Sequence, residues 1–380
     1  MNITRVLVPY VGLESKRVVQ ALKALEIDSV LAVPLDQTTP NWSSEAGFVA
    51  FYSDQNFSGL ISAAMDSGCD AIYDLNKTEM SALKLSSFCS TARIGYMNGS
   101  PEVLATLMNR VGIRWAASDL HMSVVTTSEK IESYEDGLYW LIQLGLPLVL
   151  RTLREPSQKL FTEEEVQIAL KESLKDGPVV LERLLEDVRE IETVMFSDGE
   201  NLPICLGEGD FSLRVDRERV LSEFPPQGLS DSELNKLRSQ AAQLIIGTGW
   251  KGIISARFLV TNDGRAYFLQ LNPGLKPWHW AVEHSLEVDL YEALIRVLAG
   301  DELGWKQNDI WFNGHTISLL IRSASSGRIA KLQLPRNIRI YWGPNQGDSV
   351  VKGELIGSIS IKGKSRQAAI VLAKVALDEL

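Results

Sequence analysis

Strand and helix patterns alternate along the N-terminal part of the chain, and this alternation limits the fold more than any other sequence feature. Residues 5–8 (RVLV) predict a buried strand, residues 14–25 carry apolar residues at helical spacing, and residues 29–33 (SVLAV) predict a second strand. The next predicted elements are a helix at 60–65, a strand at 71–73, a helix at 80–88 and a strand at 93–95. Such alternation predicts a parallel sheet that binds ligands at the carboxyl ends of its strands.

The rest of the chain predicts a small lobe followed by antiparallel strands. Residues 137–175 have the pattern helix, strand, helix, after a polar segment at 126–136 that is a candidate linker. Strand patterns follow from residue 191, with one long helix at 231–248, and Asn262-Asp263-Gly264 is a hairpin-turn sequence. The expected strands are 193–196, 204–206, 255–260, 265–271, 315–321, 338–342 and 355–361, and the expected closing helix is 365–380.

Composition narrows the class of partner. The chain has 380 residues with 48 acidic and 38 basic side chains, and its net charge of −10 repels polyphosphate, so nucleic acid is not an expected partner. No run approaches the roughly 18 apolar residues of a spanning helix, and no signal-peptide pattern opens the chain, so we expect a cytoplasmic protein without membrane contact. The three cysteines, Cys69, Cys89 and Cys205, are dispersed as expected for buried thiols rather than disulfides or a zinc site.

Short runs spread over the chain share their order with one enzyme family. The runs are 61–73 (ISAAMDSGCDAIY), 181–185 (LERLL) with Arg189 and Glu192, 207–210 (GEGD) with Ser212, 249–252 (GWKG), 266–272 (AYFLQLN), 288–290 (VDL) with 299–300, and the tail positions Arg339, Gly347, Val350, 356–357 and 363–377. In this order they resemble biotin carboxylase, the ATP-grasp enzyme of biotin-dependent carboxylases.

The resemblance implies an α/β and α+β multidomain protein. It has an N-terminal doubly wound parallel-sheet domain, an ATP-grasp domain with a reduced lid, and a C-terminal mixed β/α domain. The corresponding boundaries are 1–115, 116–303 with the lid lobe at about 120–185, and 304–380.

The metal-holding positions of the family have changed. By resemblance, the two glutamates that hold Mg²⁺ fall on Arg257 and Gln270, and only Asn272 is retained nearby. Hard cations need oxygen ligands. A guanidinium a few ångströms away repels Mg²⁺ by several kcal/mol at an effective dielectric of about 20. We therefore expect no metal site, no required cofactor, and at most weak binding of ATP or ADP without Mg²⁺.

The reacting groups of the family are also replaced. Gly274 stands where the resemblance places the stabilising arginine, and Trp278 stands where it places the base. His279 is an alternative base, but a lone histidine between Trp278 and Trp280 is more often a packed structural residue. We therefore expect no catalytic residue at these positions.

Some nucleotide and biotin positions persist. By resemblance, the candidate nucleotide cleft contains Arg151, Glu182, Leu259 and Arg219, and Arg339 is a candidate contact for biotin or an anion. The segment 152–161 (TLREPSQKLF) replaces a poly-glycine loop, and its bulky residues are not expected to approach a triphosphate closely.

Arg214, Arg217 and Arg219 form a short run of like charge. This run could bind an anion without a metal, but such runs more often form a solvated face.

Three functions follow from these substitutions. The first is a catalytically inactive biotin carboxylase-like protein, an accessory or regulatory subunit of a biotin-dependent acyl-CoA (acetyl-CoA) carboxylase in fatty acid biosynthesis. Its expected partners are biotin carboxylase, biotin carboxyl carrier protein or other subunits of that carboxylase, in a homo- or hetero-dimer. The second is an active ATP-dependent ligase with a rearranged site, in which Glu192, Glu208, Asp210 or Asp263 supplies metal oxygens. The third is a stand-alone nucleotide or anion sensor.

Overall fold

The computed structural model describes residues 3–53, 57–75, 79–152, 157–215, 218–335 and 338–378. Contacts divide the chain into two compact units. Unit 1 contains Met1–Asn109, Ile191–Ala256 and Leu271–Leu380, and unit 2 contains Arg110–Glu190 and Arg257–Gln270. The three-domain boundaries expected from the resemblance stay a prediction. Among the described residues, every helix is too short or too polar to span a bilayer.

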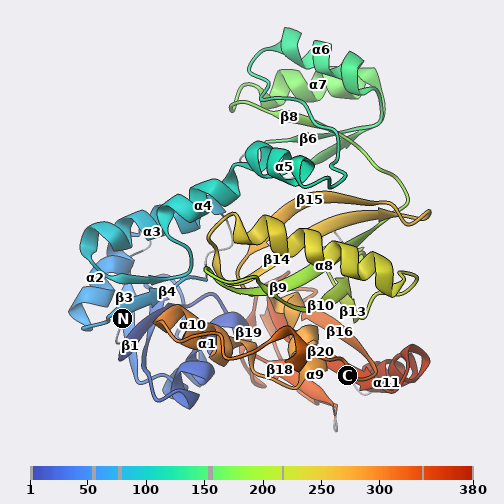
Figure 1. The fold of residues 1–380 in the computed structure, drawn as a ribbon. Coiled ribbons are helices and arrows are strands. Elements are labelled where there is room, and N and C mark those ends of the chain that lie inside the picture. The colour runs from blue at the N-terminus through green and yellow to red at the C-terminus, as the bar shows by residue number, and fades with distance from the viewer. Residues whose placement is uncertain are drawn as a thin grey trace. The chain divides into compact units, whose positions relative to one another are not determined.

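Unit 1 begins with a parallel sheet, as the alternating pattern predicts (Figure 1). Its strands are β1 (Arg5–Pro9), β2 (Asp28–Pro34), β3 (Phe48–Tyr52), β4 (Ala71–Tyr73) and β5 (Gly95–Met97). The helices of this region are α1 (Leu13–Ala24), α2 (Ser58–Asp66), α3 (Glu79–Ala92) and α4 (Pro101–Met108). The strand order is β3-β2-β1-β4-β5, and each strand runs parallel to its neighbours. The order reverses between β1 and β4, which is the point where such sheets bind ligands.

Two details of this sheet differ from the sequence expectations. Strand β3 is not predicted, and it lies at the sheet edge with the side chains of Phe48 and Phe51 exposed. The strand expected at 93–95 lies at Gly95–Met97 instead, because Arg93 has a left-handed backbone (φ 58°) that ends the preceding helix.

A second sheet has eight strands in the order β15-β14-β9-β10-β13-β16-β20-β18. The strands are β9 (Val188–Asp198), β10 (Ile204–Asp210), β13 (Leu221–Phe224), β14 (Lys251–Thr261), β15 (Ala266–Pro273), β16 (His315–Arg322), β18 (Arg339–Trp342) and β20 (Leu355–Gly363). The last strands therefore do not form a sheet of their own, because β13 pairs with β16 in an antiparallel register. The predicted hairpin turn is confirmed, with Gly264 at φ 82° between β14 and β15.

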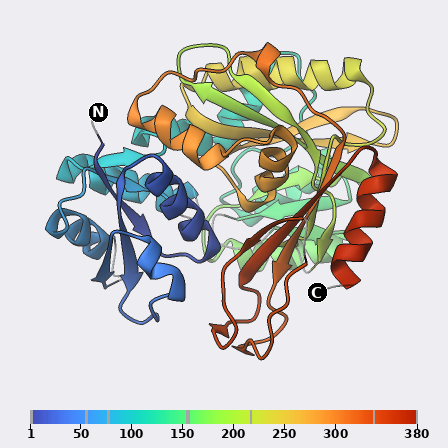
Figure 2. The ribbon, with the colours of Figure 1, turned by 90° about the horizontal axis from the view of Figure 1, so that it is seen from below.

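Four further helices of unit 1 lie in the chain between the strands of the second sheet or after its last strand. They are α8 (Asp231–Ile246), α9 (Trp280–Leu286), α10 (Leu290–Ala299) and α11 (Arg366–Asp378). Helix α8 begins with a capping box between Ser230 and Glu233, and α11 packs on β16 and β20 (Figure 2). One buried cluster joins residues of both sheets of unit 1, including Val8, Phe196 and Trp280.

Unit 2 contains the predicted helix–strand–helix lobe. Its helices are α5 (Arg110–Asp119), α6 (Tyr134–Leu144) and α7 (Glu163–Ser173), and its three-stranded sheet has the order β7 (Gln158–Leu160), β6 (Leu148–Arg151), β8 (Val180–Arg183). The candidate linker at 126–136 is wrong as a linker, because Thr127 bridges to Glu182 and the buried Ile131 bridges to Val179. Burial of Ile131 fixes this segment to the lobe.

The remaining elements are short. They are β11 (Arg214–Val215), β12 (Glu218–Arg219), β17 (Gly327–Arg328), β19 (Ser349–Val350) and the 3-10 turns η1 (Asn41–Glu45), η2 (Pro277–His279) and η3 (Gln307–Asp309). The three cysteines are free thiols, and the expected burial holds for Cys89 and Cys205, while Cys69 is half-buried.

Candidate functional site

A fully buried carboxylate, Glu192 on β9, is the centre of a polar cluster in unit 1. It forms an ion pair with the buried Arg219 of β12. The other contacts to its two oxygens are hydrogen bonds from Ser255 Oγ at 2.9 Å, Asn272 Nδ2 at 3.3 Å and Trp278 Nε1 at 3.3 Å, and a contact of 3.3 Å with His279 Nε2. The neighbouring strands β14 and β15 supply Ser255 and Asn272, and the turn η2 supplies the two rings.

These partners keep Glu192 ionised. Burial opposes its ionisation, but the Arg219 charge and the His279 hydrogen bond hold the pKa of this carboxyl well below its ordinary value. A carboxylate with a cation and several donors around it has few lone pairs left for an added ligand. We conclude that Glu192 serves as the anchor of a closed network.

His279 is a packed structural residue, as the sequence favours. It is fully buried, and burial is the main cause that lowers its pKa below the ordinary value. Its Nδ1 accepts a hydrogen bond from the backbone N–H of Lys276 at 3.3 Å. The neutral ring therefore carries its proton on Nε2, which donates to Glu192.

Trp278 covers this cluster. The Arg219 guanidinium lies 4.5 Å from the centre of the Trp278 ring and 5.0 Å from that of Phe211, so its charge is held between two aromatic faces. Gly274 directly follows strand β15 and has φ 83°, a left-handed conformation that an arginine would adopt only with strain. The backbone here is therefore compatible with glycine at the position where the resemblance expects an arginine.

The expected metal positions lie in unit 2 and do not offer a set of oxygen ligands. Arg257 forms an ion pair of 2.5 Å with Glu190, while Gln270 on β15 is an amide. The retained Asn272 belongs to unit 1, where its amide donates to Glu192. Among the described residues, no group of three or more His, Cys, Asp or Glu side chains could hold a metal ion. At the two expected positions themselves, a guanidinium and an amide therefore stand in place of carboxylate ligands.

The other carboxylates proposed as rearranged ligands already have partners. Glu208 pairs with Arg238 at 2.5 and 2.8 Å, and Asp263 pairs with Arg265 at 2.8 Å in the exposed hairpin turn. Asp210 accepts the backbone N–H of Ser212 at 2.9 Å. These contacts are separate from one another and give no convergent pair of carboxylates.

Two residues of the candidate nucleotide cleft are in contact in unit 2. Glu182 on β8 is 3% exposed and accepts from Arg151 Nε at 2.6 Å and Arg114 at 2.7 Å. Burial opposes ionisation, but the two guanidinium groups keep the pKa of Glu182 below its ordinary value. Leu259 is half-buried on β14, and its place beneath a base stays a prediction. Arg219 belongs to unit 1 and is engaged with Glu192.

The arginine run does not form one solvated face. Arg219 is 6% exposed, and Arg214, its partner on the opposite strand of a short hairpin, is half-buried, so neither side chain is fully solvated. Arg217 lies outside the described residues. Of the segment 152–161, residues 153–156 also lie outside them.

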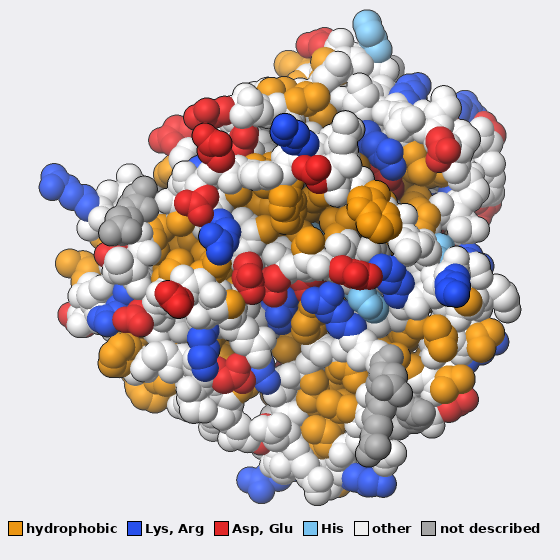
Figure 3. All heavy atoms as spheres, turned by 60° about the horizontal axis from the view of Figure 1, so that its bottom comes forward, with side chains coloured by type: hydrophobic (Ala, Val, Ile, Leu, Met, Phe, Trp, Pro, Cys, Tyr) orange, Lys and Arg blue, Asp and Glu red, His pale blue; other side chains and the backbone are white. Residues whose placement is uncertain are grey.

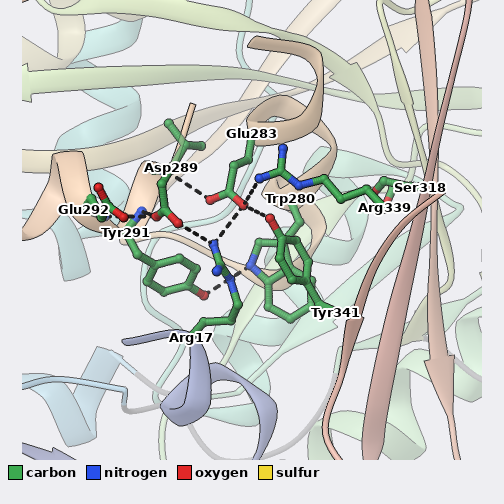
Figure 4. A network of polar contacts seen from close by, with 11 residues as sticks. Arg17, Trp280, Glu283, Asp289, Tyr291, Glu292, Ser318, Arg339 and Tyr341 are labelled. Atoms are coloured by element: carbon green, nitrogen blue, oxygen red, sulfur yellow. Dashed lines mark hydrogen bonds and ion pairs between the residues drawn. The ribbon is translucent and has the colours of Figure 1, made fainter. Parts of the chain in front are cut away.

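Arg339, the candidate biotin contact, belongs to a polar network of unit 1 (Figure 4). It lies 3.5 Å from the buried Glu283, which also pairs with Arg17 at 2.9 Å. Tyr341 donates to Glu283, and Arg17 lies 4.2 Å from the Tyr341 ring centre and reaches Asp289 at 3.1 Å. Glu283 therefore partly compensates the positive charge of Arg339 within the protein. A contact between Arg339 and biotin stays a prediction.

Sequence reasoning did not identify several of these partners. Arg114, Glu190, Ser255, Glu283 and Arg17 have no motif of their own in the sequence. The one sequence signal that could have indicated a buried charge is a charged residue within an otherwise apolar stretch, such as Arg17 before Val18 and Val19 on α1.

The fold and this site define a protein with the architecture of biotin carboxylases. The chain belongs to the family described as carbamoyl-phosphate synthase L chain, ATP binding domain, whose model matches residues 110–306. It is 25% identical to biotin carboxylase 2 of Bacillus subtilis over 345 residues, 85% of this chain and 78% of that protein. It is 28% identical to biotin carboxylase of Pseudomonas aeruginosa over 309 residues, 75% of this chain and 69% of that protein.

Solved structures confirm the predicted fold. The biotin carboxylase domain dimer of Hydrogenobacter thermophilus 2-oxoglutarate carboxylase, in complex with MgADP, ADP and bicarbonate, has a TM-score of 0.91 at 21% identity, covering 99% of this chain and 90% of that one. Biotin carboxylase of Campylobacter jejuni, in a β-γ-ATP complex, has a TM-score of 0.90 at 21% identity, covering 100% and 92%. At this identity the likeness shows the fold alone.

Proposed function

We propose that this chain does not carry out biotin carboxylation and acts as a non-catalytic subunit of a biotin-dependent acyl-CoA carboxylase. The observation that carries the proposal is the cluster around Glu192, in which Arg219, His279 and Trp278 all contact the carboxylate and leave it few lone pairs for another ligand. The ion pair of Arg257 with Glu190 supports it, because a guanidinium stands at a position where the family holds a metal.

The proposal requires no metal and no nucleotide for function. Its partners are biotin carboxylase, biotin carboxyl carrier protein or other carboxylase subunits in the cytoplasm, with a homo- or hetero-dimer as the working assembly. On the face drawn in Figure 3, the basic side chains of the described residues alternate with acidic ones. This mixture supports the exclusion of nucleic acid from the partners.

The alternative of an active ligase with a rearranged site has less support. It needs two carboxylates near one metal, whereas Glu192, Glu208 and Asp263 each pair with an arginine of their own. The third function, a nucleotide sensor, is supported by the two arginines Arg151 and Arg114, which could bind phosphate. Both arginines, however, already form ion pairs with Glu182.

Co-purification from the native organism tests the subunit role. The tagged full chain is expected to retain biotin carboxyl carrier protein or biotin carboxylase through a wash at about 0.15 M salt, where weak surface charge contacts are screened. A biotin carboxylase expressed with the same tag is the positive control. Recovery of neither protein, in a lysate where the control retains its partner, would overturn the proposed role.

A further inference from the structure

Helix α11 carries its larger apolar side chains on its outward face. It packs against β16 and β20 within unit 1 (Figure 2), and the residues that it buries there are all alanine. They are Ala369, Ala373 and Ala376. Val371, Leu372 and Val375 are instead 51%, 46% and 53% exposed. A surface helix usually turns its larger apolar residues towards the core, so packing within unit 1 does not explain these three.

The outward apolar residues form one continuous stripe. Ala368, Val371, Leu372 and Val375, the α11 stripe, follow the spacing i, i+3, i+4, i+7, which places them on the same face of the helix. The midpoint of the stripe, between Val371 and Leu372, is close to the middle of α11. Apolar residues that are exposed singly are ordinary, whereas a contiguous apolar surface is typical of an interaction site.

Opposite charges lie at the two ends of the α11 stripe. Lys364 precedes the helix and Asp378 is its last residue, and both are exposed. A surface that complements the stripe therefore needs apolar side chains in its middle, an acidic group near Lys364 and a basic group near Asp378. A second α11 that runs antiparallel to the first has these groups in this order.

A twofold axis between Val371 and Leu372 generates this antiparallel pair. It places Val371 against the partner's Leu372 and Lys364 near the partner's Asp378, and each contact occurs twice. A parallel pair would instead place the two Lys364 ammonium groups together and the two Asp378 carboxylates together, and like charges repel. The charges at the helix ends therefore favour the antiparallel pair.

We propose that two copies of this chain associate through their α11 stripes, with the two helices antiparallel about a twofold axis. Stable interfaces bury about 1,200 to 2,000 Å² in total, and three half-exposed aliphatic side chains from each copy supply only part of that area. The dimer is therefore weak and reversible, with a dissociation constant of about 10 to 100 μM. The inference goes beyond the proposed function, because this pairing needs no other carboxylase subunit.

Sedimentation velocity of the full chain, from about 1 to 300 μM at about 0.15 M salt, tests the association. The native chain is expected to be mainly monomeric at the lowest concentration and mainly dimeric at the highest. A native chain that stays monomeric up to about 300 μM would overturn the proposal. This measurement is separate from the co-purification of carboxylase subunits, so the two proposals can fail independently.

Leu372→Glu tests the surface. It is expected to weaken dimerisation about tenfold or more, because the pair would then bury two carboxylates without cationic partners beside the twofold axis. Ile142→Glu on α6, where the native side chain is 78% exposed, makes the same kind of change outside the stripe and should dimerise as the native chain does. Thermal melts establish that both variants fold. Dimerisation of Leu372→Glu at native strength would assign the contact to another surface and overturn the proposal.

Charge reversal tests the orientation. Lys364→Glu and Asp378→Lys are each expected to weaken the dimer about threefold or more, because each places like charges together at both ends of the helix pair. The double variant restores opposite charges and should dimerise nearly as the native chain does. A double variant as weak as the single variants, or single variants that dimerise more tightly than the native chain, would overturn the antiparallel arrangement.

Discussion

The Arg219 guanidinium lies over the Trp278 indole, with 4.5 Å between the guanidinium carbon and the ring centre. Each of these residues also contacts Glu192, Arg219 through an ion pair and Trp278 through its Nε1 hydrogen bond. The three side chains therefore contact one another, although they belong to three different elements, β12, η2 and β9.

Arg219→Met is expected to destabilise the protein strongly. It leaves the fully buried Glu192 without its cation, and loss of one partner of a buried pair costs about 3–5 kcal/mol. Urea unfolding of the variant and the native chain at pH 7 measures this difference. The double variant Arg219→Met with Glu192→Gln removes the uncompensated charge and should recover part of the loss. A single variant as stable as the native chain would contradict the role of Arg219.

The same pair predicts a pH dependence. The folded-state pKa of Glu192 is below its ordinary value of 4.5, so its stabilising contribution is full above that value and is lost as the pH falls further. In Arg219→Met, burial without the cation should instead raise the pKa of Glu192. Protonation of Glu192 then removes the uncompensated buried charge as the pH falls, and the variant recovers part of its free energy of unfolding. The difference in free energy of unfolding between the native chain and the variant should narrow from pH 7 to pH 5. A difference that stays constant would exclude titration of Glu192 as its source.

Trp280 is a core residue, in contrast to the half-buried Trp278. Its ring is fully buried in unit 1, packs at 5.2 Å from the Tyr341 ring centre and donates from Nε1 to Tyr291 at 3.2 Å. Trp280→Ala should lower the free energy of unfolding by about 3–5 kcal/mol, through lost burial and a residual cavity. Trp280→Phe, which keeps most of the ring volume, should cost less. Equal stability of the alanine variant and the native chain would show that the ring is not packed as described.

His284 predicts a second acid sensitivity. Burial, followed by the charges of Arg339 and Lys362, lowers its pKa from 6.5 to about 4. The unfolded chain therefore takes up a proton before the folded chain does, and stability falls as the pH drops from about 6.5 to about 4. His284→Gln should lose less stability over this interval than the native chain in urea unfolding. His121→Gln, at an exposed position, is the control and should follow the native chain.

The parallel sheet and the lobe of unit 2 were predictable because their apolar periodicity is local. Ala71–Tyr73 is a strand with the predicted bounds, and the turn at Gly264 follows from its own tripeptide. The burial of Arg219 was not predictable from its neighbours, since a run of arginines has the same composition on a surface or in a core. Glu283 and Arg17 are separated by 266 positions, so only the tertiary fold makes them partners.

Nucleotide binding separates the proposed function from the ligase alternative. Arg257 pairs with Glu190, and the described residues contain no group of three or more His, Cys, Asp or Glu side chains that could hold a metal ion, so we expect any affinity for ADP or ATP to be weak and not to increase when Mg²⁺ is added. Calorimetry with both nucleotides, with and without Mg²⁺, measures this. Affinity that develops only with Mg²⁺ would favour the ligase.

The central claim is the absence of biotin carboxylation, and bicarbonate-dependent ADP release tests it most directly. The full chain is assayed with ATP, Mg²⁺, bicarbonate and free biotin, beside biotin carboxylase 2 of Bacillus subtilis as the active control and heat-inactivated protein as the blank. Loss of a single charge-stabilising group already slows catalysis about 100-fold or more, and by the resemblance Arg257, Gln270 and Trp278 stand at the positions of several such groups, so we predict ADP release no faster than the blank. ADP release above the blank that requires both bicarbonate and biotin would contradict the account.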